Sequence, residues 1–515
     1  MSLTINSCLL LLKEHHLLKS SAIQGDPATV MTDISFDSRQ VKENCIFFCK
    51  GDRFRPAFLT MAREQGAITY VAEKPLVEGS GLNALIVRNV TKAMAILAAA
   101  FYDYPQDDLN TLAITGTKGK TTAAYFAHAI LDKQIPQRVA LFSTIERVMG
   151  TKPEDTIPAK LSTPESIDLF SEMNQASVND LTDLVMEVSS QAYLRNRVFG
   201  LTYDVGLFLN ISPDHIGENE HPNYANYLHN KIQLIMNSRK VVLNAQTQDW
   251  DMVLKSAQVS TDEDSIFIFA NKDYLSDHPE TELDFYYLVN EDLINGVKFT
   301  LKASSQKGKL LDIEGDYEIS MPGVFNVVDA VGAIISATLL GANRHEAYLG
   351  IKDVRVPGRL EVVDLKNHGT GIVDFAHNKL SLSATLNFIK TKFPQAKIGV
   401  VTGSAGEKGI NRRADMGEVL NTMADRVYLT TDDPDFEEAS DIAKEMSSCI
   451  VNENVKVQFI EDRAEAIKQA VRDSGSNDVV LIAGKGADKY MIIRGQRLPY
   501  EGDKELALKS AEELG

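Results

Sequence analysis

The strongest constraint on the fold is a glycine-rich loop, TGTKGKTT at residues 115–122, which lies directly between an apolar segment and a helical one. The apolar segment TLAI before the loop is typical of a buried strand, and TAAYFAHAILDK after it is typical of a helix. Glycines let backbone N–H groups curve around phosphate oxygens, and the amino end of the following helix carries partial positive charge. The order strand, loop, helix therefore predicts an α/β protein with a phosphate-binding loop at the edge of a mostly parallel sheet.

Two side chains of this loop have specific expected tasks. Lys120 is placed to contact the β and γ phosphates of ATP, and the Thr121 hydroxyl is placed to hold Mg²⁺. The match to the P-loop pattern is incomplete, because Ile114 stands where the pattern has its first glycine. A glycine turn without a ligand is the alternative, and the GKTT ending favours the nucleotide site. The residues of the loop expected to contact ATP are Gly116, Thr117, Lys118, Gly119, Lys120, Thr121 and Thr122.

Two more polar side chains follow apolar runs further along the chain. Glu187 ends the run LVMEV, and His215 follows FLNISPD. Because the carboxyl ends of parallel strands meet at one edge of a sheet, both are expected near the P-loop, where they would complete magnesium coordination or orient the phosphates. Each taken alone is equally well explained as a structural polar residue. Their joint placement with the loop favours a functional role.

The chain of 515 residues is longer than one hydrophobic core usually organises. The pattern of apolar, strand-like and helix-like segments changes at the polar segment 106–110, and it changes again after the helical FNVVDAVGAIISATLLG. We predict an α/β protein with three domains: a small N-terminal α/β domain at 1–107, a central P-loop ATPase domain with a mostly parallel sheet at 108–344, and a C-terminal Rossmann-like, doubly wound domain at 345–515.

The charge and the apolar segments limit the partners. Acidic residues outnumber basic ones, 71 against 53, so the formal charge of -18 argues against nucleic acid and anionic membranes. The leucine run near the start is interrupted by charged residues and predicts an amphipathic helix, and no apolar stretch is long enough for membrane insertion. The scattered cysteines suggest neither disulfides nor zinc, and Cys45 and Cys49 flank an apolar run that predicts a buried strand. We expect a cytoplasmic monomer.

Several motifs occur in an order that resembles the Mur ligases: TGTKGKTT, STPES, EVSSQAYLRNR, NISPDHIGENEHP, PGRLE and VDFAHN. The resemblance covers nearly the whole chain, including DSR near the start and GKGADKY near the end. Within the family it is greatest to the lysine-adding branch of Gram-positive bacteria. It implies an ATP-dependent, amide-bond-forming ligase of peptidoglycan synthesis that joins L-lysine to UDP-N-acetylmuramoyl-L-alanyl-D-glutamate through an acyl phosphate.

The positions that match the family's motifs imply which residues bind the UDP-linked dipeptide and which bind ATP. The residues that the resemblance implies for the UDP-linked dipeptide are Ser38, Ser162, Thr163, Ser189 and Arg197. Those that it implies for ATP, in addition to the P-loop, are Asn326, Arg359 and Asp374. Without the resemblance, Ser38 and Thr163 are explained as turn or helix-cap residues, and Arg359 as a member of a surface ion pair.

Lys231, in NYLHNKIQLI, matches the lysine that the family carries as a carbamate formed with carbon dioxide. The modification replaces a cation by an anion that ligates a second Mg²⁺, and it needs a neutral amine, so the site must lower the pKa of this lysine. The pattern alone would make Lys231 an exposed helical lysine. The resemblance thus implies ATP, two Mg²⁺ ions and the carbamate as cofactors. The implied catalytic residues are Lys120, Glu187, His215 and Lys231, and the implied metal ligands are Thr121, Glu187, His215 and Lys231.

The segment DDPD, residues 432–435, bears on which amino acid the enzyme adds. The diaminopimelate-adding branch has arginine at the fourth place, where Asp435 stands here, and a carboxylate there would repel that substrate's second carboxylate. Lys408 stands where the family often has arginine, and Asp488 where it often has glutamate. Both differences keep the charge of the side chain but change its length and hydrogen-bond geometry. An acidic turn without specificity is the alternative. The residues implied for the amino acid are Lys408, Asp432, Asp433, Pro434, Asp435, Gly484 and Asp488.

Other functions remain as alternatives at this point. One is the same ligation with meso-diaminopimelate or another diamino acid, and another is the glutamate addition of folylpolyglutamate synthetases, which lack the NISPDHIGENEHP segment. A third, of a different class, is a nucleotide-regulated binding protein that has lost ligation. The intact Lys120, Glu187, His215 and Lys231 argue against this third alternative.

Overall fold

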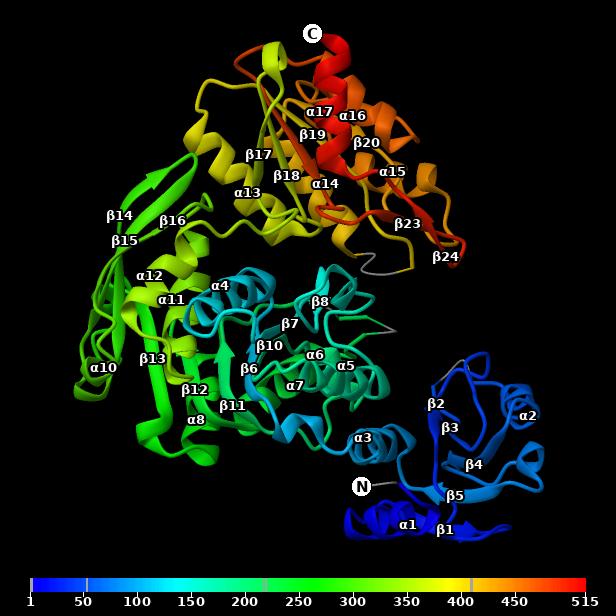
Figure 1. Ribbon diagram of the computed structural model, residues 1–515. Coiled ribbons are helices and arrows are strands. Elements are labelled where there is room, and N and C mark those ends of the chain that lie inside the picture. Colours follow the sequence, from blue (N-terminus) through cyan, green and yellow to red (C-terminus); the bar gives the residue numbers. More distant parts are fainter. Residues whose placement is uncertain (1–2, 52–53, 215, 218–219, 408–410) are drawn as a thin grey trace.

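The computed structural model describes residues 3–51, 54–214, 216–217, 220–407 and 411–515. Over these residues the strands form three large sheets, one after another along the chain, and a short ribbon near its end. Figure 1 shows three successive units, the first in blue, the second in cyan and green, and the third in yellow to red. The predicted α/β fold with three domains is confirmed.

The first unit has a sheet in the order β1-β5-β4-β3-β2, in which β1 is antiparallel to β5 and the other neighbours are parallel. Its strands are β1 (Leu18–Ala22), β2 (Asp33–Ser35), β3 (Cys45–Phe48), β4 (Ala67–Ala72) and β5 (Asn83–Val87). Its helices are α1 (Ile5–Glu14), α2 (Pro56–Glu64) and α3 (Val90–Phe101). Both local predictions hold here, since α1 buries Ile5, Cys8 and Leu12 along one face, and all of β3 is buried.

The central sheet has the order β16-β15-β14-β13-β12-β11-β6-β10-β7-β8-β9, parallel from β14 to β7 and antiparallel at both ends. Its strands are β6 (Asn110–Thr115), β7 (Val139–Phe142), β8 (Glu146–Val148), β9 (Thr156–Pro158), β10 (Asp183–Glu187), β11 (Tyr203–Phe208), β12 (Ser238–Asn244), β13 (Ile266–Asn271), β14 (Phe285–Leu293), β15 (Gly296–Ala303) and β16 (Gly315–Ile319). Its helices are α4 (Lys120–Gln134), α5 (Ser166–Val178), α6 (Ser190–Leu194), α7 (Tyr224–Met236), α8 (Trp250–Ser260), α9 (Tyr274–Asp277), α10 (Gln306–Leu310), α11 (Phe325–Leu339) and α12 (Arg344–Lys352).

Two cores cover the two faces of this sheet. On β6, Leu112 and Ile114 pack with α4 and α11 on one face, whereas Ala113 points to the other face, as the two-residue period of a strand requires. The second core contains Phe170 of α5 and continues into the first unit through Leu97 of α3. The sheet is thus buried on both faces, which explains why its central strands are almost wholly apolar.

The third sheet has the order β17-β18-β22-β19-β20-β21, parallel except for β17. Its strands are β17 (Glu361–Asp364), β18 (Thr370–Asp374), β19 (Ile398–Thr402), β20 (Arg426–Leu429), β21 (Lys456–Phe459) and β22 (Val479–Ala483), followed by the ribbon β23 (Tyr490–Ile493) and β24 (Gln496–Pro499). Its helices are α13 (Lys379–Lys392), α14 (Asn411–Met423), α15 (Ala439–Ser448), α16 (Arg463–Arg472) and α17 (Asp503–Leu514). Separate apolar clusters on the two faces make it doubly wound.

The packing of α12 bears on the second domain boundary. Ala347 and Ile351 of this helix lie in the same core as α4 and α11, and so does Val356 beyond it. We therefore propose that the third domain begins after Val356, instead of at residue 345. The sequence placed the boundary earlier because α12 follows the glycine at the end of α11.

Within the described residues, no helix is both long and apolar enough to span a membrane.

Candidate functional site

The P-loop connects β6 to α4, as the sequence predicts. Gly119 has a positive φ of 86°, and a Cβ atom there would lie 2.1 Å from a carboxyl oxygen of Asp329, so only glycine fits. The backbone N–H of Thr117 donates to the carbonyl of Asn210 at 3.1 Å, which ties the loop to the end of β11. The Lys120 ammonium donates to the carbonyl of Gly116 at 2.9 Å and so lies folded over its own loop. This geometry holds a lysine and several N–H groups where phosphates would bind.

A cavity of about 430 Å³ opens between this loop and the third unit. The fold brings together, along its lining, predicted residues from separate segments of the central and third units: Thr117, Lys118, Gly119, Lys120, Thr121, Thr122, Ser162, Glu187, Asn326, Arg359 and Asp374. Sequence reasoning missed other residues of its lining, chiefly Thr144, Phe325, Asp329, Phe375, His377 and Leu380. Of these, Phe375 and His377 carried a signal because they lie in the VDFAHN motif, and Asp329 lies one helical turn after Asn326 in FNVVDA.

Glu187 is fully buried at the end of β10 and faces this cavity. Its carboxylate accepts the backbone N–H of Thr144 at 2.6 Å and the Thr144 hydroxyl at 3.0 Å. The same hydroxyl lies 2.8 Å from the hydroxyl oxygen of Ser162. Thr163 donates to the backbone carbonyl of Glu187 at 3.0 Å and accepts the N–H of Ser189 at 3.0 Å. The STPE segment and the end of β10 therefore form one hydrogen-bonded group.

Lys231 lies on α7, and its side chain is buried, contrary to what its polar pattern alone predicts. Burial holds the pKa of its amine well below the ordinary value, and the nearby cations Lys120 and Lys118 lower it further, while Asp214 opposes them. The amine lies 5.0 Å from the centre of the Tyr227 ring. A lysine in this environment gives up its proton readily, which is the condition for reaction with carbon dioxide.

From the third unit, Arg359 lies over the Phe375 ring, 4.4 Å from its centre. Burial lowers its pKa, whereas Asp374 and Glu187 raise it. The Asp374 carboxylate accepts the backbone N–H groups of Leu360 at 2.9 Å and Ala376 at 3.0 Å, so it fixes the loops around Arg359. We therefore attribute to Asp374 a role in shaping the cavity.

Asp214 joins the central and third units beside the P-loop. Its carboxylate lies 3.6 Å from the ammonium of Lys118, accepts from Arg412 at 3.0 Å and accepts from the Asn378 amide at 3.1 Å. Burial lowers the pKa of Lys118 to about 8, against the effect of Asp214. One carboxylate therefore links two residues of the third unit to a lysine of the phosphate-binding loop.

The acidic loop after β20 is held by the ribbon β23–β24. Asp433 accepts the Lys485 ammonium and the backbone N–H of Ile492, both at 2.8 Å. The Asp435 carboxylate accepts the N–H of Gly495 at 2.7 Å. Burial raises the pKa of Asp432, the first residue of the loop, to about 6.

The other residues predicted for the amino acid meet at the same place. A Cβ atom on Gly484 would lie 2.1 Å from a carboxyl oxygen of Asp432, and Pro434 packs against the backbone of Gly406. Asp488 lies 3.3 Å from the ammonium of Lys485. Three of the predicted acidic residues, Asp432, Asp433 and Asp488, therefore lie around the buried Lys485.

The remaining predicted residues lie apart from the cavity or outside the described chain. Ser38 is buried in the first unit. Arg197 pairs with Glu165 at 2.9 Å, and Lys50 of the first unit pairs with the same carboxylate, so cations from two units meet there. His215 and Lys408 lie outside the described residues.

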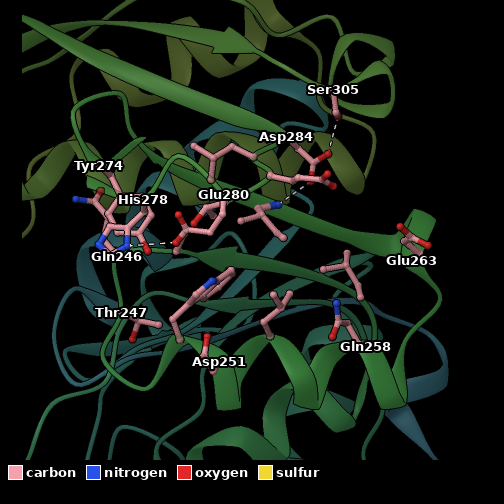
Figure 2. Close-up of a pocket in the computed structure, with 18 of the residues that line it drawn as sticks. Gln246, Thr247, Asp251, Gln258, Glu263, Tyr274, His278, Glu280, Asp284 and Ser305 are labelled. Carbon is pink, nitrogen blue, oxygen red and sulfur yellow. Dashed lines mark hydrogen bonds and ion pairs between the residues drawn. The ribbon is translucent and has the colours of Figure 1, made fainter. Parts of the chain in front are cut away.

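A larger cavity, about 1350 Å³, lies elsewhere, around the ends of β12 and β13 (Figure 2). Tyr274 and His278 stack there at 4.3 Å between ring centres, and Asp284 accepts the Ser305 hydroxyl at 2.5 Å. None of the predicted site residues that the structure describes lines it. Cavity volume therefore does not identify the site, because the predicted site residues line the smaller cavity.

The fold and the smaller cavity define a P-loop enzyme that uses ATP at the junction of two α/β units. Family models named Mur ligase middle domain and Mur ligase, glutamate ligase domain match residues 114–337 and 358–486. The chain belongs to the Mur ligase family.

Two relatives and one solved structure support this assignment. UDP-N-acetylmuramyl-tripeptide synthetase of Lacticaseibacillus paracasei is 51% identical, over 100% of this chain and 99% of the relative. UDP-N-acetylmuramoyl-L-alanyl-D-glutamate–L-lysine ligase of Streptococcus pneumoniae is 42% identical, over 98% of both chains. A solved UDP-N-acetylmuramoyl-L-alanyl-D-glutamate–2,6-diaminopimelate ligase has the same fold, with a TM-score of 0.63 at 23% identity over 100% of this chain and 99% of that one. The protein is an ATP-dependent ligase of peptidoglycan synthesis.

Proposed function

We propose that the chain joins L-lysine to UDP-N-acetylmuramoyl-L-alanyl-D-glutamate, using ATP, two Mg²⁺ ions and a carbamate on Lys231. The relative named for lysine ligation is 42% identical, whereas the structural neighbour named for diaminopimelate ligation is 23% identical. The observation that carries the choice of amino acid is the position of Asp435 in the acidic loop. We also propose that the protein is a cytoplasmic monomer, and light scattering would test the oligomeric state.

The charges of this loop are unequally neutralised. Lys485 pairs with Asp433 at 2.8 Å and with Asp488 at 3.3 Å. For Asp435, no ion pair with a lysine or arginine occurs within the described residues. A substrate ammonium near Asp435 would therefore be attracted, whereas the second carboxylate of diaminopimelate would be repelled.

The side chains at the smaller cavity fit Mg²⁺. Thr121 and Glu187 both line it, and Glu187 offers a buried carboxylate. Among the described residues, no three or more His, Cys, Asp or Glu side chains gather as a metal site. This agrees with Mg²⁺, which is usually held by one or two carboxylates, water and substrate phosphates. Bound Mg²⁺ would neutralise phosphate charge, and the low-pKa amine of Lys231 fits the proposed carbamate.

In the proposed reaction, the D-glutamate carboxylate attacks the γ-phosphate of ATP, giving an acyl phosphate and ADP. The α-amine of lysine then attacks the acyl carbon, and phosphate leaves. Lys120 from the P-loop and Arg359 from the third unit line the cavity and stabilise negative charge on the transferred phosphoryl group.

The test of the function is ligation by the purified protein. UDP-muramoyl dipeptide and ATP are supplied with lysine, diaminopimelate or ornithine, and phosphate release and product mass are measured. We expect lysine to give the highest kcat/KM. Diaminopimelate used as well as lysine would contradict the proposed specificity, and ATP binding without any product would favour the non-ligating alternative.

Two substitutions at Asp435 separate charge from structure. Asp435→Asn keeps an oxygen that can accept the N–H of Gly495 and removes the negative charge, and Asp435→Arg reverses the charge. We expect the KM for lysine to rise by roughly tenfold in the first variant and further in the second, with the KM for ATP unchanged. Asp441→Asn, at an exposed aspartate of the same unit, is the matched control. An equal effect in this control would show that the charge of Asp435 has no specific role.

A further inference from the structure

Arg147, on the short strand β8, is a buried cation behind the smaller cavity. Its side chain is only 2% exposed, and it does not itself line the cavity. Its guanidinium donates to the backbone carbonyls of Ser143 and Leu161, and its Nε lies 3.3 Å from a carboxyl oxygen of Glu172 on α5. A buried charge is unfavourable unless it is paired and hydrogen-bonded, and these contacts supply both.

The two carbonyls belong to different loops that meet at the site. Ser143 directly precedes Thr144, and Leu161 directly precedes Ser162. Both Thr144 and Ser162 line the cavity, and their hydroxyl oxygens lie 2.8 Å apart. One guanidinium therefore fixes the spacing of two segments that are separated in the sequence by the strands β8 and β9.

The first of these loops also orients the carboxylate of Glu187. Thr144 donates to both of its oxygens, from the backbone at 2.6 Å and from the hydroxyl at 3.0 Å. Movement of residues 143–144 would therefore turn Glu187 away from its present direction. The planar guanidinium reaches the two carbonyls and the carboxylate at once, which the single ammonium of a lysine does less well.

We propose that Arg147 is a positioning residue for the ligation, and that it aims Glu187 and Ser162 by tying their supporting loops together. The inference rests on the proposed function. Arg147 acts through the central unit, because its contacts with Ser143, Leu161 and Glu172 all lie there. The amino-acid loop belongs to the third unit, so the KM for lysine should be independent of Arg147.

The test compares Arg147→Ala, Arg147→Lys and wild type in steady-state kinetics. We expect kcat to fall roughly 10- to 100-fold in Arg147→Ala, as happens when supporting contacts of a site are lost. The KM for the UDP-linked dipeptide should rise, and the KM for lysine should not change. Added guanidinium, below denaturing concentration, should restore part of kcat in Arg147→Ala. Arg147→Lys keeps the charge and guards against a variant that fails to fold, and it should remain impaired.

The matched control is Arg239→Ala, which removes an exposed arginine of the central sheet that pairs with Asp204. It should leave all kinetic constants unchanged. The inference is overturned if folded Arg147→Lys has wild-type kcat and KM for the dipeptide. It is also overturned if Arg147→Ala loses activity only in proportion to its unfolded fraction and guanidinium restores nothing. Wild-type protein that fails to ligate lysine would instead overturn the proposed function.

Discussion

Asp329→Asn tests whether burial keeps a carboxyl group protonated beside the P-loop. Burial raises the pKa of Asp329 from 3.8 to about 8, against the opposing effect of Lys120. Between these two values the folded chain holds a proton that the unfolded chain has released, so the free energy of unfolding falls by about 1.4 kcal/mol for each pH unit. This stability is fully present below the unfolded pKa and is lost as the pH rises through the folded pKa.

Between about pH 5 and about pH 8, the predicted loss is at most about 4 kcal/mol. Rearrangement around the ionised group reduces such penalties, and we expect about 2 kcal/mol. Asparagine does not ionise and avoids this loss, so the variant should match wild type near the lower pH and unfold later near the higher one. In a domain of this size, 2 kcal/mol corresponds to roughly 4–8 °C in Tm.

Calorimetry at both pH values measures the difference, with the transitions of the domains fitted separately. Asp251→Asn, at an exposed aspartate of the central unit, controls for the loss of one carboxylate. A Tm difference between variant and wild type that is the same at both pH values would refute the reasoning, as would a variant less stable than wild type at the higher pH.

Three further predictions concern the site. Gly119→Ala should destabilise the protein by about 2 kcal/mol and abolish binding of an ATP analogue in calorimetry, because φ is 86° and Asp329 occupies the space of the new Cβ; tight binding would contradict this. Lys231→Ala should lower kcat at least about tenfold with little change in Tm, and full activity would argue against the carbamate. Asp214→Asn should weaken the contacts with Lys118 and Arg412 and raise the KM for ATP by roughly three- to tenfold, whereas an unchanged KM would show that this junction does not affect nucleotide binding.

The sequence predicted those parts of the site that depend on local order. The P-loop is a continuous strand, loop and helix, so its conformation follows from nearby residues, and Glu187 ends a strand that its apolar run already reveals. The low pKa of Lys231 was not predictable from its helix alone, because it depends on burial and on the charges of Lys120, Asp214 and Lys118, which lie on other segments.

Contacts between distant segments explain what sequence patterns missed. Thr144 lies in a loop and Arg147 on the three-residue strand β8, and both have partners from residues 161–187, so no periodic pattern marks them. The sequence predicted Asp433 and Asp435 as residues for the amino acid, but it did not indicate that Asp433 pairs with Lys485 or that Asp435 accepts the N–H of Gly495, about sixty residues further along. Polar residues at such junctions are chosen by tertiary neighbours that a local pattern does not contain.

The shared core of α3 decides how the chain can be divided. Leu97 of α3 and Phe170 of α5 belong to one apolar cluster, which also holds Phe48 of the first sheet. A fragment starting at residue 108 would leave this cluster open to water and should aggregate, although the boundary looks natural in the sequence. A fragment ending after Val356 keeps both cores of the central sheet closed, and it is the piece to isolate for crystallising the first two units without the third.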